Sequence, residues 1–252
     1  MKQFIIAIVL LIFSSNVFAQ KNYNQSLQGI KKVVIRSESG VEIKAHDKNE
    51  LLIIGEDREI PEKAKGLKAV YAGGSDNTGF GLYAKKDGET LIITNLKNTY
   101  SSKLEIFLPQ TVNLAVERSN LGSIYIKGFA AEIEADTNVG SITLEDVTGP
   151  VVAKSSTGVI NIIFSKVSQS SPISIISATG AIDVSLPSST PANLELKTAM
   201  GEIYTDFDIK FPVKDEDMKI IAGKRAINTQ LNNGGVQISL RSSTGNIYLR
   251  KK

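Results

Sequence analysis

Short runs of alternating apolar and polar residues recur through the second half of the chain, and each run follows the same signal, Ser/Thr-x-x-Gly. A Ser or Thr oxygen favours a tight turn, and the glycine lets the chain leave it. Alternating apolar residues, with Ile first, are typical of a strand that buries one face. Each copy therefore predicts a turn followed by a strand. The copies begin at Ser119, Thr137, Ser155, Ser177, Thr198 and Ser242, and we expect the first buried residues to be Ile124, Ile142, Ile160, Ile182, Ile203 and Ile247.

The copies return at nearly regular intervals. Their first five glycines, at Gly122, Gly140, Gly158, Gly180 and Gly201, are 18, 18, 22 and 21 residues apart. Gly245 follows after 44 residues, twice 22, with Gly223 midway. Apolar residues also alternate upstream of each turn, so each repeat holds at least two strands. Repeats of this length bury their faces by stacking on one another. The expected fold is all-β, a β-solenoid of 18–22-residue coils, with residues 207–234 as an outward excursion on a coil that has lost its turn signal.

The N-terminal part of the repeat region, about residues 30–112, is less regular than the repeats in about residues 113–252. Strand patterns occur at residues 33–35, 41–43, 51–54, 91–94 and 104–108, and Ser37-Glu-Ser-Gly40 is an imperfect seventh copy of the turn. Residues 20–30 are polar, and we expect them to be frayed. Residues 73–81 are rich in glycine but lack the Gly-Lys-Ser/Thr ending and the following helix of a phosphate-binding loop. We interpret them as a hairpin or loop.

Residues 1–19 have the pattern of a secretory signal peptide, with the basic Lys2, an apolar run over residues 4–13, and Val17 and Ala19 at the positions that a cleavage site requires. Cleavage is expected between Ala19 and Gln20. A membrane anchor is the alternative, but the apolar run is short for a bilayer span. We therefore expect residues 20–252 to form a single domain that is exported to the periplasm, the cell surface or the medium and is not membrane-embedded.

Composition adds two constraints. The chain has no Cys, so the stability of an exported protein must come here from its core and its strand ladders. The formal net charge of +3 is too small to indicate nucleic-acid binding by itself. We expect no nucleic-acid partner.

The sequence offers no evident catalytic set. His46 is the only histidine, and one histidine cannot supply a Ser-His-Asp triad or a histidine-based metal site without further ligands, so we interpret it as a surface loop residue. The carboxylates are scattered, as on a solvated strand face, whereas a glycosidase needs two at a defined separation. We expect no enzyme activity, no metal and no cofactor, and a polysaccharide-active β-helix enzyme is the alternative.

Two columns of outward residues favour a binding role. The residue before each turn is basic in five of seven copies, and in stacked coils these side chains would form a ladder with a spacing of about 4.8 Å. A second column mixes Tyr with short polar residues, a composition suited to sugars. An ordinary solvent face, with cations that discourage aggregation, is the alternative. The expected ligand-face residues are Arg118, Lys154, Lys197, Arg241, Tyr125, Tyr204 and Tyr248, with an acidic glycan or an envelope protein as the partner.

Three segments carry a family resemblance: Val34-Ile-Arg-Ser-Glu-Ser-Gly-Val-Glu-Ile43, Leu104-Glu-Ile-Phe-Leu-Pro109, and the closing residues 234–249. In these segments the chain resembles the adhesin-like family of bacterial exported β-strand-repeat proteins, whose function is unknown. The resemblance covers nearly all of the mature chain. It implies a β-solenoid at or outside the cell envelope and supplies no catalytic residues. The function we expect is a non-enzymatic, exported adhesin-like or envelope structural module, with a periplasmic partner in envelope signalling as a further alternative.

Overall fold

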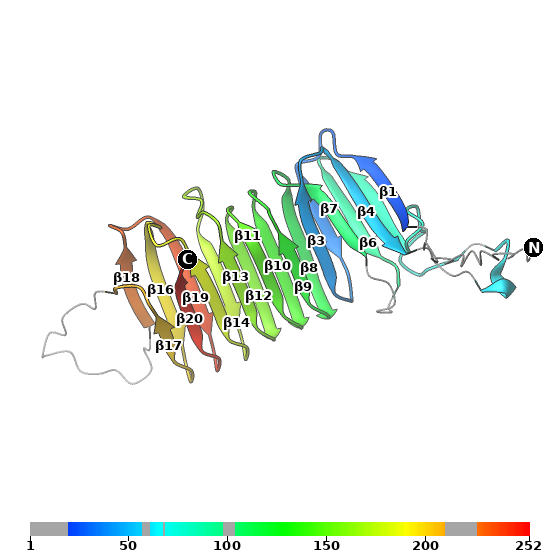
Figure 1. Cartoon of the computed structure of the whole chain (residues 1–252). Helices are drawn as coiled ribbons and strands as arrows, with labels where there is room; N and C mark the ends of the chain where they lie inside the picture. Colours follow the sequence, from blue (N-terminus) through cyan, green and yellow to red (C-terminus); the bar gives the residue numbers. More distant parts are fainter. Residues whose placement is uncertain (1–19, 57–60, 68, 98–103, 210–225) are drawn as a thin grey trace, which may run out of the picture.

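The computed structural model describes residues 20–252 apart from residues 57–60, 68, 98–103 and 210–225 (Figure 1). The predicted signal peptide, residues 1–19, lies outside the described residues, and so does Gly223. The described part of the chain forms β-strands and one short 3-10 helix, η1 (Glu62–Ala64). Within it, no helix is long and apolar enough to cross a membrane.

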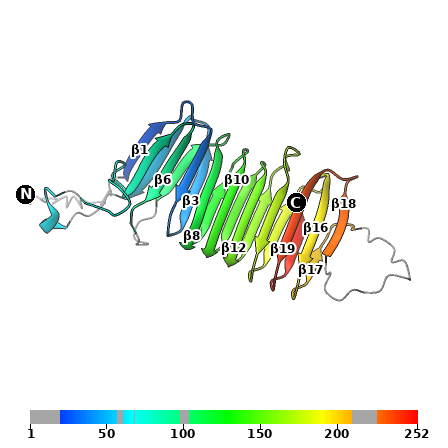
Figure 2. The same cartoon turned by 180° about the vertical axis from the view of Figure 1, so that it is seen from behind.

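The strands form two ten-stranded sheets that run along an elongated stack (Figure 1; Figure 2 shows the reverse side). Sheet A has the spatial order β1 (Gln20–Ser26), β4 (Glu50–Glu56), β7 (Glu105–Pro109), β3 (Val41–His46), β9 (Ile124–Lys127), β11 (Ile142–Val147), β13 (Ile160–Phe164), β15 (Ile182–Leu186), β20 (Ile247–Lys251) and β17 (Ile203–Thr205). Sheet B has the order β18 (Ala226–Leu231), β16 (Ala192–Thr198), β19 (Val236–Ser242), β14 (Ile173–Ser177), β12 (Val151–Thr157), β10 (Ile133–Val139), β8 (Asn113–Leu121), β2 (Lys32–Arg36), β6 (Thr90–Asn95) and β5 (Leu82–Asp87).

Most of the stack consists of coils that give one strand to sheet B and the next strand to sheet A. In the coil β12–β13, alternate residues are buried, beginning with Val151 in sheet B and Ile160 in sheet A. Neighbouring coils pair in parallel, so Ile160 lies in register with Ile142 on one side and with Ile182 on the other. Inward residues from both sheets form one continuous apolar core. This architecture confirms the predicted β-solenoid.

The coils do not follow sequence order at the C-terminal end. The last coil, β19–β20, lies between β14–β15 and β16–β17, because Ile238 pairs with Ile173 on one side and with Leu194 on the other. The excursion predicted for residues 207–234 is wrong for its described strand. That strand, β18, does not belong to an extra parallel coil but pairs antiparallel with β16. After the long step between the last two copies, the chain therefore returns to a position inside the stack, between the coils β14–β15 and β16–β17.

The N-terminal end is arranged in the same way. The first coil in sequence, β2–β3, lies between β8–β9 and β6–β7. Strand β5 covers β6, and β4 and β1 extend sheet A beyond β7, all by antiparallel pairing. The prediction of a frayed segment is wrong for Gln20–Ser26, which form β1. Backbone pairing along β4 holds this strand at the edge of the sheet, so the strand does not need an apolar pattern. Such covering strands keep the parallel edges beneath them from pairing with other chains.

Neighbouring coils approach each other closely at the corner between the two strands of a coil. Ser155 Oγ, at the start of one Ser/Thr-x-x-Gly turn, donates to the carbonyl oxygen of Gly140 in the preceding coil, at 3.3 Å. A Cβ on Gly158 would lie only 2.0 Å from that same oxygen, so a side chain does not fit. In the coil β19–β20 the turn hydroxyl also caps its own turn, since Gly245 N donates to Ser242 Oγ at 2.9 Å. The turn signal therefore serves contact between coils as well as the turn itself.

Replacing Ile160 by Ala should lower the free energy of unfolding by about 2–5 kcal/mol, because the fully buried side chain leaves a cavity in the middle of the stack. Ile163 in the same strand faces outward and is 38% exposed, so Ile163→Ala is the matched control, with an expected change below about 0.5 kcal/mol. Urea unfolding of residues 20–252 measures both. Equal losses in the two variants would contradict the register.

Candidate functional site

The predicted basic column lies on the outer face of sheet B, in an order that the stack determines. Lys154 lies in register with Asp136 on one side and Ile176 on the other. Arg241 comes next, between Ile176 and Lys197. The structure therefore brings Arg241 and Lys197 together in the reverse of their sequence order and separates both from Lys154 by an apolar residue.

Arg118 does not continue this column regularly. The pairing of β8 with β10 shifts by one residue beyond Val116, and Arg118 lies within the irregularity. On the other side of β8, Glu117 lies opposite Arg36. The Nε group of Arg36 donates to Glu117 at 2.6 Å, and this hydrogen bond raises the pKa of Arg36.

Carboxylates from nearby strands also partner other cations of sheet B. Arg241 Nη2 donates to both oxygens of Glu195, at 2.8 and 2.7 Å, and these bonds hold the pKa of Glu195 below its usual value. Lys32 Nζ lies 2.8 Å from Glu134 Oε1. The outer face of sheet B thus mixes both signs of charge instead of presenting an uninterrupted positive ladder.

The predicted tyrosine column lies on the outer face of sheet A, on the other side of the core from the basic column. We call this column the tyrosine face, and its order in the stack is Tyr125, Thr143, Asn161, Asp183, Tyr248 and Tyr204. The rings of Tyr204 and Tyr248 stack with their centroids 5.3 Å apart and their planes at 9°. Tyr125 is separated from this pair by three short residues. The seven predicted ligand-face residues therefore do not form one face.

Charged neighbours orient the stacked pair. The guanidinium of Arg250 lies 5.4 Å from the ring centroid of Tyr248, and its Nε and Nη2 groups donate to Asp183 at 2.8 and 2.9 Å. The hydroxyl of Tyr204 donates to Glu202, and this bond raises the pKa of Tyr204. These contacts hold the two rings at fixed angles to the sheet.

Short polar side chains separate the aromatic groups of the tyrosine face. Four strand steps lead from Tyr125 to Tyr248, about 19 Å at ordinary strand spacing, and Thr143 and Asn161 lie between them. The hydroxyl of Tyr125 donates to Glu145 at 2.8 Å, and burial together with this bond raises the pKa of Tyr125 to about 12. The face combines aromatic ends with hydrogen-bonding groups between them.

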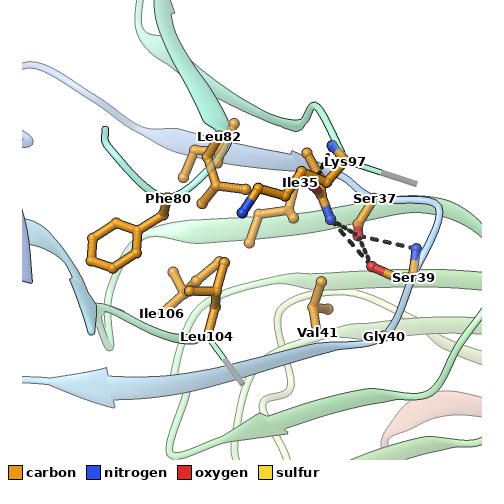
Figure 3. A pocket seen from close by; sticks show the side chains of 12 residues that line it. Ile35, Ser37, Ser39, Gly40, Val41, Phe80, Leu82, Lys97, Leu104 and Ile106 are labelled. Carbon is orange, nitrogen blue, oxygen red and sulfur yellow. Dashed lines mark hydrogen bonds between the residues drawn. The ribbon is translucent and has the colours of Figure 1, made fainter. Parts of the chain in front are cut away.

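A pocket opens between the two sheets at the N-terminal end of the stack (Figure 3). It has a volume of about 140 Å³ and is lined by Ile35, Ser37, Ser39, Gly40, Val41, Phe80, Leu82, Ile93, Asn95, Lys97, Leu104 and Ile106. In Figure 3, Phe80, Leu104 and Ile106 lie on one side, and the hydrogen-bonded Ser37 and Ser39 lie on the other. Sequence reasoning missed this pocket. Its only signal was the lack of a Ser/Thr-x-x-Gly turn between residues 91–94 and 104–108.

The glycine-rich residues 73–81 form a loop whose Phe80 lines this pocket. The carboxylate of Asp76 accepts hydrogen bonds from the backbone N–H groups of Thr78, Gly79 and Gly81 at 3.0, 2.8 and 2.8 Å. Burial acts to raise the pKa of Asp76, but these donors outweigh it and hold the pKa below its usual value. The loop's own carboxylate thus takes the donors that an anion would need, and the loop places Phe80 in the core.

His46 is the last residue of β3 and is half-buried, so the prediction of a surface loop residue is wrong. Its Nε2 atom lies 2.8 Å from the carbonyl oxygen of Glu50, which fixes the ring at the turn into β4. Among the described residues, no group of three or more His, Cys, Asp or Glu side chains is placed to hold a metal ion.

Comparison with known proteins gives one family and several solved structures of similar fold, two of which are described here. The family described as Toastrack DUF4097 matches residues 111–250, which confirms the predicted resemblance to a repeat family of unknown function. No curated protein matches the chain. The fold is similar to a "putative cell adhesion protein" from Clostridium sporogenes ATCC 15579, at 9% identity and a TM-score of 0.49 over 92% of this chain and 99% of that one. It is also similar to a "putative adhesin" from Bacteroides fragilis NCTC 9343, at 12% identity and a TM-score of 0.44 over 92% and 97%.

Replacing Asp76 by Asn should lower the free energy of unfolding at pH 7 by about 1–2 kcal/mol, because three backbone donors lose a charged acceptor. The folded pKa of Asp76 is depressed, so its contribution is complete above the ordinary value near 3.9 and is lost as the pH falls through the folded value. Urea unfolding at pH 7 and near pH 2 measures the difference. The exposed Asp87→Asn is the control, and a loss at Asp76 that does not change with pH would contradict the account.

Proposed function

The chain belongs to the Toastrack DUF4097 family, and from this premise we propose that it is an exported, non-enzymatic binding module that holds an extended glycan on the tyrosine face of sheet A. The family match at residues 111–250 includes the whole of this face. The signal-peptide pattern of residues 1–19 supports export. A module of this kind would act as an adhesin or as a structural element of the cell envelope.

The observation that carries the proposal is the stacked pair of Tyr204 and Tyr248 on an outward face. Tyrosine rings supply a large contact area at low entropic cost and keep a polar tip for hydrogen bonding. The apolar faces of sugar rings pack on such rings, and sugar hydroxyl groups pair with amide and hydroxyl side chains such as those of Asn161 and Thr143. Tyr204, on the last strand of the sheet, is 46% exposed and is open to a ligand.

The backbone holds these groups in position before any ligand arrives. Tyr204 and Tyr248 lie on strands that pair in register, and Glu202 and Arg250 orient their rings. A preorganised face loses little conformational entropy on binding. Parallel strands at a constant spacing of about 4.8 Å also present a repeating surface, which suits a polymer better than a small molecule.

The enzyme alternative needs two carboxylates with different roles. Glu42 and Glu105 are cross-strand neighbours on sheet A, but the ammonium of Lys44 lies 2.8 Å from one and 2.5 Å from the other. The Lys44 ammonium thus pairs with both carboxylates, whereas each carboxyl group of a glycosidase pair must reach the scissile bond or the attacking water. This arrangement supports a structural role for the pair.

Binding of residues 20–252 to an array of neutral and acidic glycans, followed by titration of the best ligand, tests the proposal. The double variant Tyr204→Ala/Tyr248→Ala should weaken binding at least about tenfold, which is about 1.4 kcal/mol, because it removes the aromatic contact area. Its free energy of unfolding should change little, since both side chains lie on the outer face of the sheet, away from the core.

The matched control is a quadruple variant on the opposite sheet, in which Arg118, Lys154, Lys197 and Arg241 are all replaced by Gln. This variant should bind the glycan as the wild type does. Loss of binding in the control alone, with affinity that falls steeply as salt rises, would move the site to sheet B and an acidic polymer. Absence of glycan binding by the wild-type protein would reject the proposal.

A further inference from the structure

Two outward columns of sheet A would lie beneath a glycan on the tyrosine face. The first column is the tyrosine face itself, and its one charged member between Tyr125 and Tyr248 is Asp183. Side chains two residues apart on a strand point to the same side of the sheet. The second column therefore faces the same way, in the order Lys127, Glu145, Ile163, Ser185 and Arg250. The charges of both columns decide which glycans the face accepts.

Both cations of these columns are paired with carboxylates. Arg250 Nε and Nη2 donate to Asp183 Oδ1 and Oδ2 at 2.8 and 2.9 Å, so the guanidinium and the carboxylate form a bidentate pair. Lys127 Nζ lies 3.5 Å from Glu145 Oε2, and the same oxygen accepts a hydrogen bond from the hydroxyl of Tyr125 at 2.8 Å. A carboxylate on a ligand would have to displace one of these partners before it could pair with a cation.

Carboxylates also border the face at both of its ends. Glu42, on the strand next to β9, shares the ammonium of Lys44 with Glu105, so two carboxylates meet one cation there. Glu202 accepts a hydrogen bond from Tyr204 at the other end. The ends of the face thus carry surplus negative charge, which repels a polyanion over about 8–10 Å at physiological ionic strength.

The middle of the face is uncharged. Thr143, Asn161 and Ser185 offer hydroxyl and amide groups that both donate and accept hydrogen bonds. Ile163 is exposed and adds apolar surface beside them. Neutral sugar hydroxyl groups also donate and accept, so they match these side chains and leave no charge unpaired. An ionised carboxylate only accepts, and it would lose hydration here without gaining a cation.

We propose that the glycan held on the tyrosine face is a neutral polysaccharide, and that the ion pairs of the second column make the face select against acidic glycans. This inference rests on the proposed function and adds the class of ligand to it. Asp183 is the main specificity-determining residue, because its carboxylate occupies two donors of Arg250 beside Tyr248. The acidic glycan expected from the basic column of sheet B would belong to a different face.

Titration of residues 20–252 at physiological salt with matched polymers tests the proposal. The pairs are hydroxyethyl cellulose and carboxymethyl cellulose, mannan and mannuronan, and galactan and galacturonan. In each pair that binds, the neutral member should bind at least about tenfold more tightly, because the acidic member meets paired cations and surplus carboxylates. Acidic members that bind as tightly as neutral ones would overturn this inference and leave the proposed function in place. Absence of binding to all of the polymers would count against both.

Asp183→Asn tests the pair that sets the specificity. It frees the guanidinium of Arg250, so the preference for the neutral member should fall at least about threefold, and the gain in acidic binding should disappear at high salt. Asp183→Asn/Arg250→Gln should restore the preference, because it removes the freed cation. A preference that is unchanged in Asp183→Asn would overturn the proposal.

Glu195→Gln is the matched control, since it frees Arg241 from its carboxylate partner on the outer face of sheet B. It should leave the preference as in the wild type. A shift towards acidic polymers in this control and not in Asp183→Asn would place recognition on sheet B and overturn the proposal. Exposed ion pairs contribute little to stability, so all of these variants are expected to fold, and circular dichroism checks that they do.

Discussion

The backbone contact at the Ser/Thr-x-x-Gly corner determines how the coils lie on one another. From Gly140 to Gly201, each corner glycine lies so close to the glycine carbonyl of a neighbouring coil that a Cβ would approach that oxygen to 2.3 Å or less. At four of these five steps a turn hydroxyl bonds to the same oxygen, and Ser177 is the exception. The glycine packing is therefore the contact common to all steps. Because it aligns the corners, it also aligns the isoleucine core, the tyrosine face and the charges of sheet B.

The N-terminal pocket and the stacked pair of Tyr204 and Tyr248 lie at the two ends of this series of contacts. Beyond Gly40, residues 96–104 of the outer coil contain no glycine, and a pocket with both apolar and polar lining residues lies between the sheets. At the other end, Gly201 belongs to the last coil of sheet A, so Tyr204 lies on a strand with a neighbour on only one side in the described structure. The central coils satisfy one another through parallel ladders and a continuous core. The end coils keep surfaces that the repeat does not cover.

The repeat made the strands and the buried isoleucines predictable, because the turn chemistry and the period of two are local properties. Five of the six are buried, and Ile203 is half-buried because its coil is the last in sheet A. The spatial order of the coils was not predictable. Copies with the same corner fit one another equally well, and the length of the connecting segments excludes only some of the possible orders. The pairing of Arg241 with Glu195 follows from that non-sequential order. Edge strands such as Gln20–Ser26 have little apolar signal because backbone pairing supports them.

The replacement of Gly180 by Ala, measured by urea unfolding of residues 20–252 beside Gly88→Ala, tests the central role of the corner contact. A Cβ at Gly180 would lie 1.7 Å from Gly158 O, and Gly180 is outside the left-handed region of φ. Gly88 has a φ of +59° and nothing within 4 Å, so its replacement adds backbone strain alone, about 1–2 kcal/mol. We predict that Gly180→Ala costs more than Gly88→Ala, by about 1–3 kcal/mol or enough to prevent folding. A Gly180→Ala protein within about 0.5 kcal/mol of the wild type would contradict the account.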